Sequence, residues 1–167
     1  YLGFNANMLA NEMFLDSASL RSSVVSHAKT LGYETTSARA AYATLNVNLS
    51  TADNSKTMPA GTAFTTSVDG TNYRFVTIAD ITSSNTGNEV PFDSIKVYEG
   101  SYITTRYTVN TSNVDQKFTL SNANSDTSTL IVKVQTSTSD TSTTTYTKAT
   151  DITQLSSSST VYYLQEA

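Results

Sequence analysis

Apolar residues return at every second position of the chain from about residue 40 onward. Ala43, Leu45, Val47 and Leu49 alternate with polar residues, a period typical of a half-buried β-strand. The 167 residues include 24 serines and 30 threonines but only ten basic and fourteen acidic residues. Many β-branched residues with few charges favour sheets over helices. Most of the chain is therefore predicted to form β-structure.

Two turn signals divide the segments that follow. In residues 58–61, Pro59 suits the second position of a turn and Gly61 the fourth. Asp69 and Gly70 stand between alternating runs and predict a tight hairpin, because such a turn needs positive φ at both positions. The two residues after Gly70 would lengthen this loop if they stay outside the next strand.

Short strands are expected at regular intervals along the rest of the chain. After the first strand, which begins near residue 43, the candidates are 62–68, 73–78, 94–99, 102–109, 117–120, 130–135, 143–148 and 160–165. Eight or nine short strands predict an antiparallel sandwich or a barrel-like pair of sheets. The Ser- and Thr-rich stretches 121–129 and 136–145 are expected to form hairpin loops and strand edges.

The first 32 residues differ from the rest because helix-forming residues dominate them. We expect one helix over about 5–15 and a second that begins at Asp16 or Ser17. Gly32 follows the second helix, where a left-handed cap would end it. The two helices are expected to form a short hairpin with one apolar face each.

The predicted fold class is α+β, with a short N-terminal helical hairpin followed by a mainly antiparallel β-sandwich-like body. Residues 1–39 are expected to form the helical hairpin and a connector, and residues 40–167 an antiparallel β domain truncated at its C-terminal end. The chain begins at Tyr1 without an initiator Met, so we expect it to be an internal piece of a longer polypeptide.

Reactive groups in the patterns that enzymes use are scarce in this sequence. The chain has no Cys, and its one histidine, His27, falls within an apolar helical stripe where packing is the expected role. Seven aspartates lie beside small polar residues in predicted turns, and we expect them to form those turns: Asp69, Asp80, Asp93, Asp115, Asp126, Asp140 and Asp151. The prediction is a protein that is not an enzyme, with no catalytic, cofactor or metal site.

Charge and hydropathy also limit the classes of partner that this chain is expected to bind. The formal net charge is -4 and basic residues do not cluster, so nucleic acid is not an expected partner. No apolar run approaches the ~20 residues that span a bilayer, so membrane insertion is not expected.

Apolar residues on the two predicted helices are the candidate functional residues. They are expected to pack on the sheet, on neighbouring sequence or on another subunit. These interface or packing candidates are Met8, Met13, Phe14, Leu20, Val24, His27 and Leu31.

Residues 11–33 resemble a helical run of the large baseplate wedge subunit of contractile-tailed phages of the T-even type, related to J-like baseplate proteins. That run reads acid-S-A-x-L-R-x-x-V-V-S-x-A-K-x-L-G-Y, and residues 37–47 match the strand after it, with Ala41 or Tyr42 where a Pro is often found. Further segments look like successive parts of the same subunit, in order: 68–75, 97–100, 106–109, 126–130 and 159–166.

The resemblance implies a structural protein of the virion tail baseplate, assembled in the host cytoplasm. Members of the family pair with a second copy of the same subunit and with other baseplate wedge proteins, and they join wedges into a ring around the hub. The ring rearranges during contraction of the tail, and no catalytic residue comes with the resemblance.

Two other functions fit the residues. One is a glycan-binding β-sandwich module of a phage or bacterial surface adhesin, which would use the Tyr- and Thr-rich face of the sheet. The other is an enzyme that uses paired acids on a polysaccharide.

Overall fold

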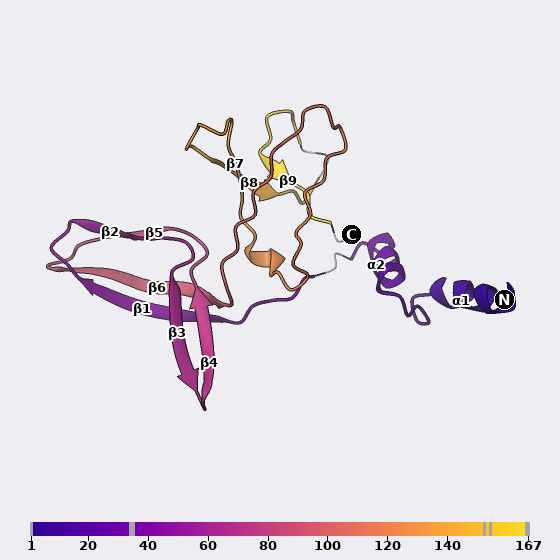
Figure 1. Ribbon diagram of the computed structural model, residues 1–167, viewed down its shortest axis with the longest axis horizontal. Helices are drawn as coiled ribbons and strands as arrows, with labels where there is room; N and C mark the ends of the chain where they lie inside the picture. The colour runs from indigo at the N-terminus through magenta and orange to yellow at the C-terminus, as the bar shows by residue number, and fades with distance from the viewer. Residues whose placement is uncertain (1, 34–35, 152, 154, 166–167) are drawn as a thin grey trace. The chain divides into compact units, whose positions relative to one another are not determined.

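A computed structural model describes residues 2–33, 36–151, 153 and 155–165 (Figure 1). The chain divides into two compact units, one of Ala38–Thr129 and one of Tyr1–Ser37 with Leu130–Ala167. The division at residue 39 made from the sequence stays a prediction, because these units group the chain by spatial proximity alone. In the described part of the chain, no helix has the length and apolar character needed to cross a membrane.

The N-terminal segment forms two helices, α1 (Leu2–Glu12) and α2 (Arg21–Thr30). Both predicted helices exist, but α1 ends earlier than expected and α2 begins later. The intervening residues form a turn in which Phe14 C=O accepts hydrogen bonds from the N–H groups of Ser17 and Ala18. These bonds form a turn at residues 14–18, and the second helix therefore begins at Arg21 and not at residue 16 or 17.

The end of α2 confirms the predicted glycine cap. Gly32 has φ 81, the left-handed conformation that glycine adopts without steric cost. Its N–H donates to Lys29 C=O at 3.0 Å, and the N–H of Tyr33 donates to Ala28 C=O at 2.9 Å. This pair of bonds is the Schellman motif, which satisfies the last carbonyl groups of a helix.

A four-stranded antiparallel sheet lies in the unit Ala38–Thr129, counting the described residues. Its strands are β1 (Tyr42–Ser50), β3 (Ala63–Val68), β4 (Thr71–Val76) and β6 (Glu89–Glu99), in the order β1-β6-β4-β3. Residues 68 and 71 pair directly, so the predicted β3–β4 hairpin is confirmed with a two-residue loop. The loop residues 69 and 70 have φ 50 and 78, as a tight hairpin turn requires.

The core of this unit is built on one face of β6. Apolar residues of β1, β3, β4 and a second ribbon pack against four buried side chains of β6, which are Val90, Phe92, Ile95 and Val97. The predicted alternation of β1 is confirmed, because Ala43, Leu45 and Val47 are half-buried between exposed polar neighbours. At the end of the strand, Leu49 is exposed.

A β-bulge keeps all four buried residues of β6 on the same face. Phe92 and Ile95 are three positions apart, a spacing that would place them on opposite faces of a regular strand. The register shifts at this point, so that Asp93 and Ser94 together oppose Asn46 of β1. Ser94 has φ 54, and its N–H donates to Asn46 Oδ1 at 2.7 Å. The extra residue returns the side chains of Ile95 and Val97 to the face of β6 that packs on the core.

A separate two-stranded ribbon covers the core with β2 (Ser55–Met58) and β5 (Ile81–Ser84), neither of which was predicted. Met58 and Ile81 pair across this ribbon and pack against the core. The predicted turn after β2 is present but shifted by one position. Thr62 N–H donates to Pro59 C=O, and Gly61, with φ 83, takes the third turn position.

The predicted strands 102–109 and 117–120 are wrong, because neither joins a ladder. Hydrogen bonds from side chains, and not a β-ladder, hold residues 107–119 together. The Tyr107 hydroxyl donates to Thr119 C=O, and Gln116 bonds two backbone groups across the intervening loop. Such side-chain bonds offer the backbone an alternative to ladder pairing.

The C-terminal strands lie where they were predicted, although all three are shorter. They are β7 (Val132–Val134), β8 (Thr144–Lys148) and β9 (Val161–Tyr162). β7 pairs with β8 in antiparallel fashion and β8 with β9 in parallel, and the short 3-10 helix η1 (Thr127–Thr129) precedes them. The α+β class is therefore confirmed, with two short helices followed by mainly antiparallel strands.

Candidate functional site

The candidate interface residues lie along α1, α2 and the turn between them. Their side chains are solvent-exposed, except for two on α2 that are half-buried. The exposed ones are Met8, Met13, Phe14, Leu20 and Leu31, and the half-buried ones are Val24 and His27. Exposed apolar side chains on neighbouring turns form a surface of the kind that protein partners cover.

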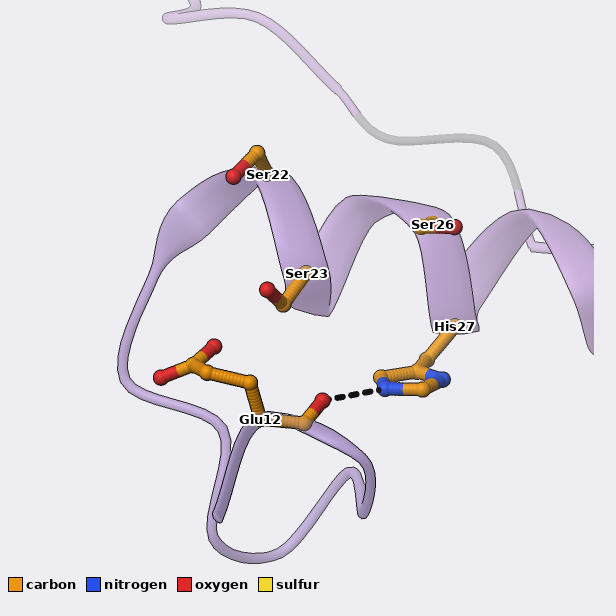
Figure 2. Close-up of a pocket in the computed structure, with 5 residues that line it drawn as sticks. All are labelled: Glu12, Ser22, Ser23, Ser26 and His27. Atoms are coloured by element: carbon orange, nitrogen blue, oxygen red, sulfur yellow. Dashed lines mark hydrogen bonds between the residues drawn. The ribbon is translucent and has the colours of Figure 1, made fainter. Parts of the chain in front are cut away.

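The carboxylate of Glu12, the last residue of α1, binds the start of α2. Glu12 Oε1 accepts hydrogen bonds from Ser19 N–H at 2.9 Å and Ser19 Oγ at 2.7 Å, and also from Leu20 N–H at 3.2 Å. Leu20 occupies the N-cap position, and its side chain has no group that could cap the helix. Glu12 thus supplies the acceptor that this helix start lacks, and in Figure 2 its carboxylate lies beside the first turn of α2.

These bonds lower the pKa of Glu12 from an ordinary value of 4.5 to about 2, with the Ser19 hydroxyl as the largest cause. The Ser19 N–H, the Ser23 hydroxyl and the Leu20 N–H act in the same direction. The carboxylate is therefore charged at neutral pH. A negative charge at this position also interacts favourably with the positive end of the helix dipole.

His27 links the middle of α2 to the end of α1. Its Nε2 lies 2.9 Å from the backbone oxygen of Glu12, a contact marked by the dashed line in Figure 2. A carbonyl oxygen only accepts, so the bond assigns the proton to Nε2. Together the carboxylate and carbonyl of Glu12 fasten two turns of α2 to the end of α1.

These groups line an open hollow of about 310 Å³, together with three serines. Its lining residues are Glu12, Ser22, Ser23, Ser26 and His27. His27 Nε2 donates to the Glu12 carbonyl, and the Glu12 carboxylate binds the N-terminus of α2, so both groups take part in a helix cap.

A turn role was predicted for all seven aspartates, and side-chain hydrogen bonds confirm it for three of them. The carboxylates of Asp126, Asp140 and Asp151 each accept a hydrogen bond from the N–H two residues ahead, which is the geometry of an Asx turn. Among the described residues, no group of three or more His, Asp or Glu side chains is placed to hold a metal ion.

Asp126 makes a second, long-range contact. Its Oδ2 accepts the N–H of Ala40 at 2.9 Å, which ties the connection that leads into β1 to a segment near the end of the same unit. Burial raises the pKa of Asp126, but hydrogen bonds from Ser128 and Ala40 outweigh this effect and hold the pKa below its ordinary value. The carboxylate therefore joins the two ends of the unit Ala38–Thr129.

Sequence reasoning missed the role of Glu12. It expected the second helix to begin at residue 16 or 17, which left no uncapped helix start near Ser19 and Leu20. The usual capping box places the acid three residues inside the helix that it caps, whereas Glu12 precedes α2 and belongs to another helix. The missing cap at Leu20 is a usable signal only once the true start of α2 is known.

No protein-family model matches this chain, and no curated protein matches it either.

Proposed function

We propose that this chain is a structural part of a phage virion, a fragment of a tail baseplate wedge subunit. It works through protein–protein contacts that join wedges into a ring around the hub. The exposed apolar side chains of the N-terminal segment support the general claim that the protein acts through its surfaces. The wedge assignment is supported by the ordered sequence motifs described above.

One observation carries the proposal. Two large apolar side chains of the turn between α1 and α2 face solvent, with Met13 67% exposed and Phe14 62% exposed. Each would release about 1.5–3 kcal/mol on full burial, so the two side chains would be major contributors to the binding energy of an interface that covers them.

The Glu12 cap supports the same function. Ordering a flexible segment on binding costs free energy, which lowers the affinity of an interface. The carboxylate and carbonyl of Glu12 fix the turn between α1 and α2 before any partner binds. The apolar residues on that turn are thus presented in one arrangement.

The experiment measures binding to the wedge proteins encoded next to the complete reading frame. Purified chain is mixed with each neighbour, and complexes are measured by calorimetry and by size-exclusion chromatography. The double variant M13S/F14S removes the two exposed side chains. The matched control is Val114→Ser, because Val114 is an equally apolar residue that is 98% exposed outside the helices.

We expect the unaltered chain and the control to bind alike, and M13S/F14S to bind at least tenfold more weakly. Circular dichroism should show all three folded, because the side chains of Met13 and Phe14 already face water. Failure of every neighbouring wedge protein to bind would refute the wedge assignment. Equal binding by M13S/F14S would refute the role of the turn between the two helices.

A further inference from the structure

β1 is an edge strand whose own residues carry none of the usual edge protection, because the bulge in its ladder lies in β6. In the sheet order β1-β6-β4-β3 it pairs with β6 alone, and its other side is open (Figure 1). Its nine residues, YATLNVNLS, contain no charged residue, no Pro and no Gly. Natural proteins block exposed edges with Lys, Pro, bulges or very short strands, because an open edge pairs readily with another strand.

The backbone groups on the open side follow from the ladder to β6. Ala41 C=O accepts from Glu99 N–H at 2.8 Å, and Thr51 N–H donates to Asn88 C=O at 3.0 Å, so odd-numbered residues bond toward β6. Alternate residues of a strand bond to opposite sides, and the even-numbered residues therefore point their N–H and C=O outward. They are Tyr42, Thr44, Asn46, Asn48 and Ser50, and no described residue bonds their backbone groups.

We propose that β1 pairs in antiparallel fashion with β1 of a second copy of this chain, with the two-fold axis at Asn46. In this register Asn46 opposes Asn46 of the second copy, Thr44 opposes Asn48, and Tyr42 opposes Ser50. All five outward-facing residues pair with one another along the full length of the strand. The ladder adds roughly ten main-chain hydrogen bonds, one donor and one acceptor for each such residue in each copy.

The side chains of β1 match a second β1 on both faces. On the core face, Leu45 opposes Val47 and Ala43 opposes the exposed Leu49, so that each half-buried residue gains an apolar neighbour. On the outer face the pairs are polar or aromatic, and no like charges face each other. Opposed like charges are what usually penalises such self-pairing, and here the net charge of -4 lies outside the strand.

The other edge of the sheet is a poorer candidate for the same contact. β3 has six residues, and Phe64 is its single half-buried residue. A strand added there would extend no continuous apolar face. The longer, regularly alternating β1 is therefore the edge that fits a second copy.

The first test uses the absence of Cys in the chain. Thr44→Cys and Asn48→Cys chains are prepared separately and oxidised alone or mixed. Opposed residues of a hydrogen-bonded pair have Cα atoms about 5.5 Å apart, within the range of a disulfide. We expect a cross-linked dimer in the mixture and little in either variant alone, because position 44 faces position 48 and not itself. Equal cross-linking in all three samples, or none in the mixture, would overturn the proposal.

The second test changes charge at the same two exposed positions. T44K/N48K places lysine opposite lysine across the axis, whereas the control T44K/N48D places lysine opposite aspartate. Sedimentation velocity of the full 167-residue chain should show a dimer that weakens at least tenfold in T44K/N48K relative to T44K/N48D. A monomer at all concentrations, open-ended polymers, or a dimer equally strong in both variants would overturn it.

A second copy is also a partner that the wedge resemblance implies, but the two claims rest on different residues. This inference concerns β1, whereas the proposed function rests on α1, α2 and the turn between them. Failure of the β1 pairing would leave binding by the helices intact, and loss of binding in M13S/F14S would leave the β1 dimer intact. The two experiments therefore distinguish the two claims.

Discussion

Deletion of Ser94 tests whether the bulge in β6 sets the phase of the core. Ser94 and Asp93 together oppose Asn46, and the extra residue returns Ile95 and Val97 to the buried face. Without it, side chains alternate regularly through β6. Either Ile95 and Val97 or the two buried residues before the bulge must then point to solvent.

The cost follows from the burial of those side chains. Ile95 is 4% exposed and Val97 is fully buried. Moving a side chain of this size from the core to water costs about 1.5–3 kcal/mol, so the deletion should cost roughly 3–6 kcal/mol. Domains of this kind are stable by about 5–15 kcal/mol, so the loss takes a large part of the total or unfolds the unit.

The control is Ser94→Gly, which keeps the bulge and its backbone bond to Asn46. The φ of 54 at this position is strained for serine and easy for glycine, so this variant should be as stable as the unaltered chain or more stable by up to about 1 kcal/mol. Urea denaturation followed by tyrosine fluorescence and far-ultraviolet circular dichroism measures both changes. An unaltered midpoint in the deletion variant would refute the reasoning, as would an equal loss in Ser94→Gly.

Three further outcomes are expected. Glu12→Gln should remove an acid-sensitive contribution to the order of α2. Because the folded pKa is lowered from 4.5 to about 2, this contribution is complete above about pH 4.5 and is lost as pH falls toward 2, which the Ser19 amide signal in an NMR titration would report. Asp126→Asn should lower the free energy of unfolding of the unit Ala38–Thr129 by roughly 1 kcal/mol, because it weakens the bond to Ala40, and an unaltered urea midpoint would contradict this. Leu20→Asp should leave the melting temperature nearly unaltered while it abolishes assembly, because Leu20 is 46% exposed in the isolated chain.

Local signals in the sequence predicted the features that few residues determine. The Asp69–Gly70 hairpin needs positive φ at two adjacent positions, and the left-handed cap at Gly32 needs it at one. The alternation from Ala43 to Val47 likewise depends on one strand with one buried face. Each of these elements was found where the residues placed it.

Long-range contacts explain what the sequence did not predict. The alternation in β6 changes phase at Ser94, so a search for a period of two found 94–99 and missed the first half of the strand. The ribbon of β2 and β5 is short and polar, and it forms because Met58 and Ile81 reach a core supplied by other strands. Conversely, the β-forming segment 102–109 has no partner strand, so its propensity is not realised.

In the candidate site, too, local features were predicted and long-range contacts were not. The apolar residues of the helices were identifiable from their spacing, since α1 and α2 both form. The bonds from Glu12 to Ser19 and Leu20 cross a turn whose path depends on where both helices stop, and no short motif specifies it. Whether the seven candidates contact a partner stays a prediction.

Hydrogen–deuterium exchange of the chain, alone and in complex with its neighbouring wedge proteins, tests most directly whether the N-terminal helices are the contact surface. We predict that amides of Leu2–Glu12 and Arg21–Thr30 exchange at least tenfold more slowly in the complex, because a partner covers the apolar side chains around them. A complex that forms while exchange in both helices keeps its free-chain rate would contradict it.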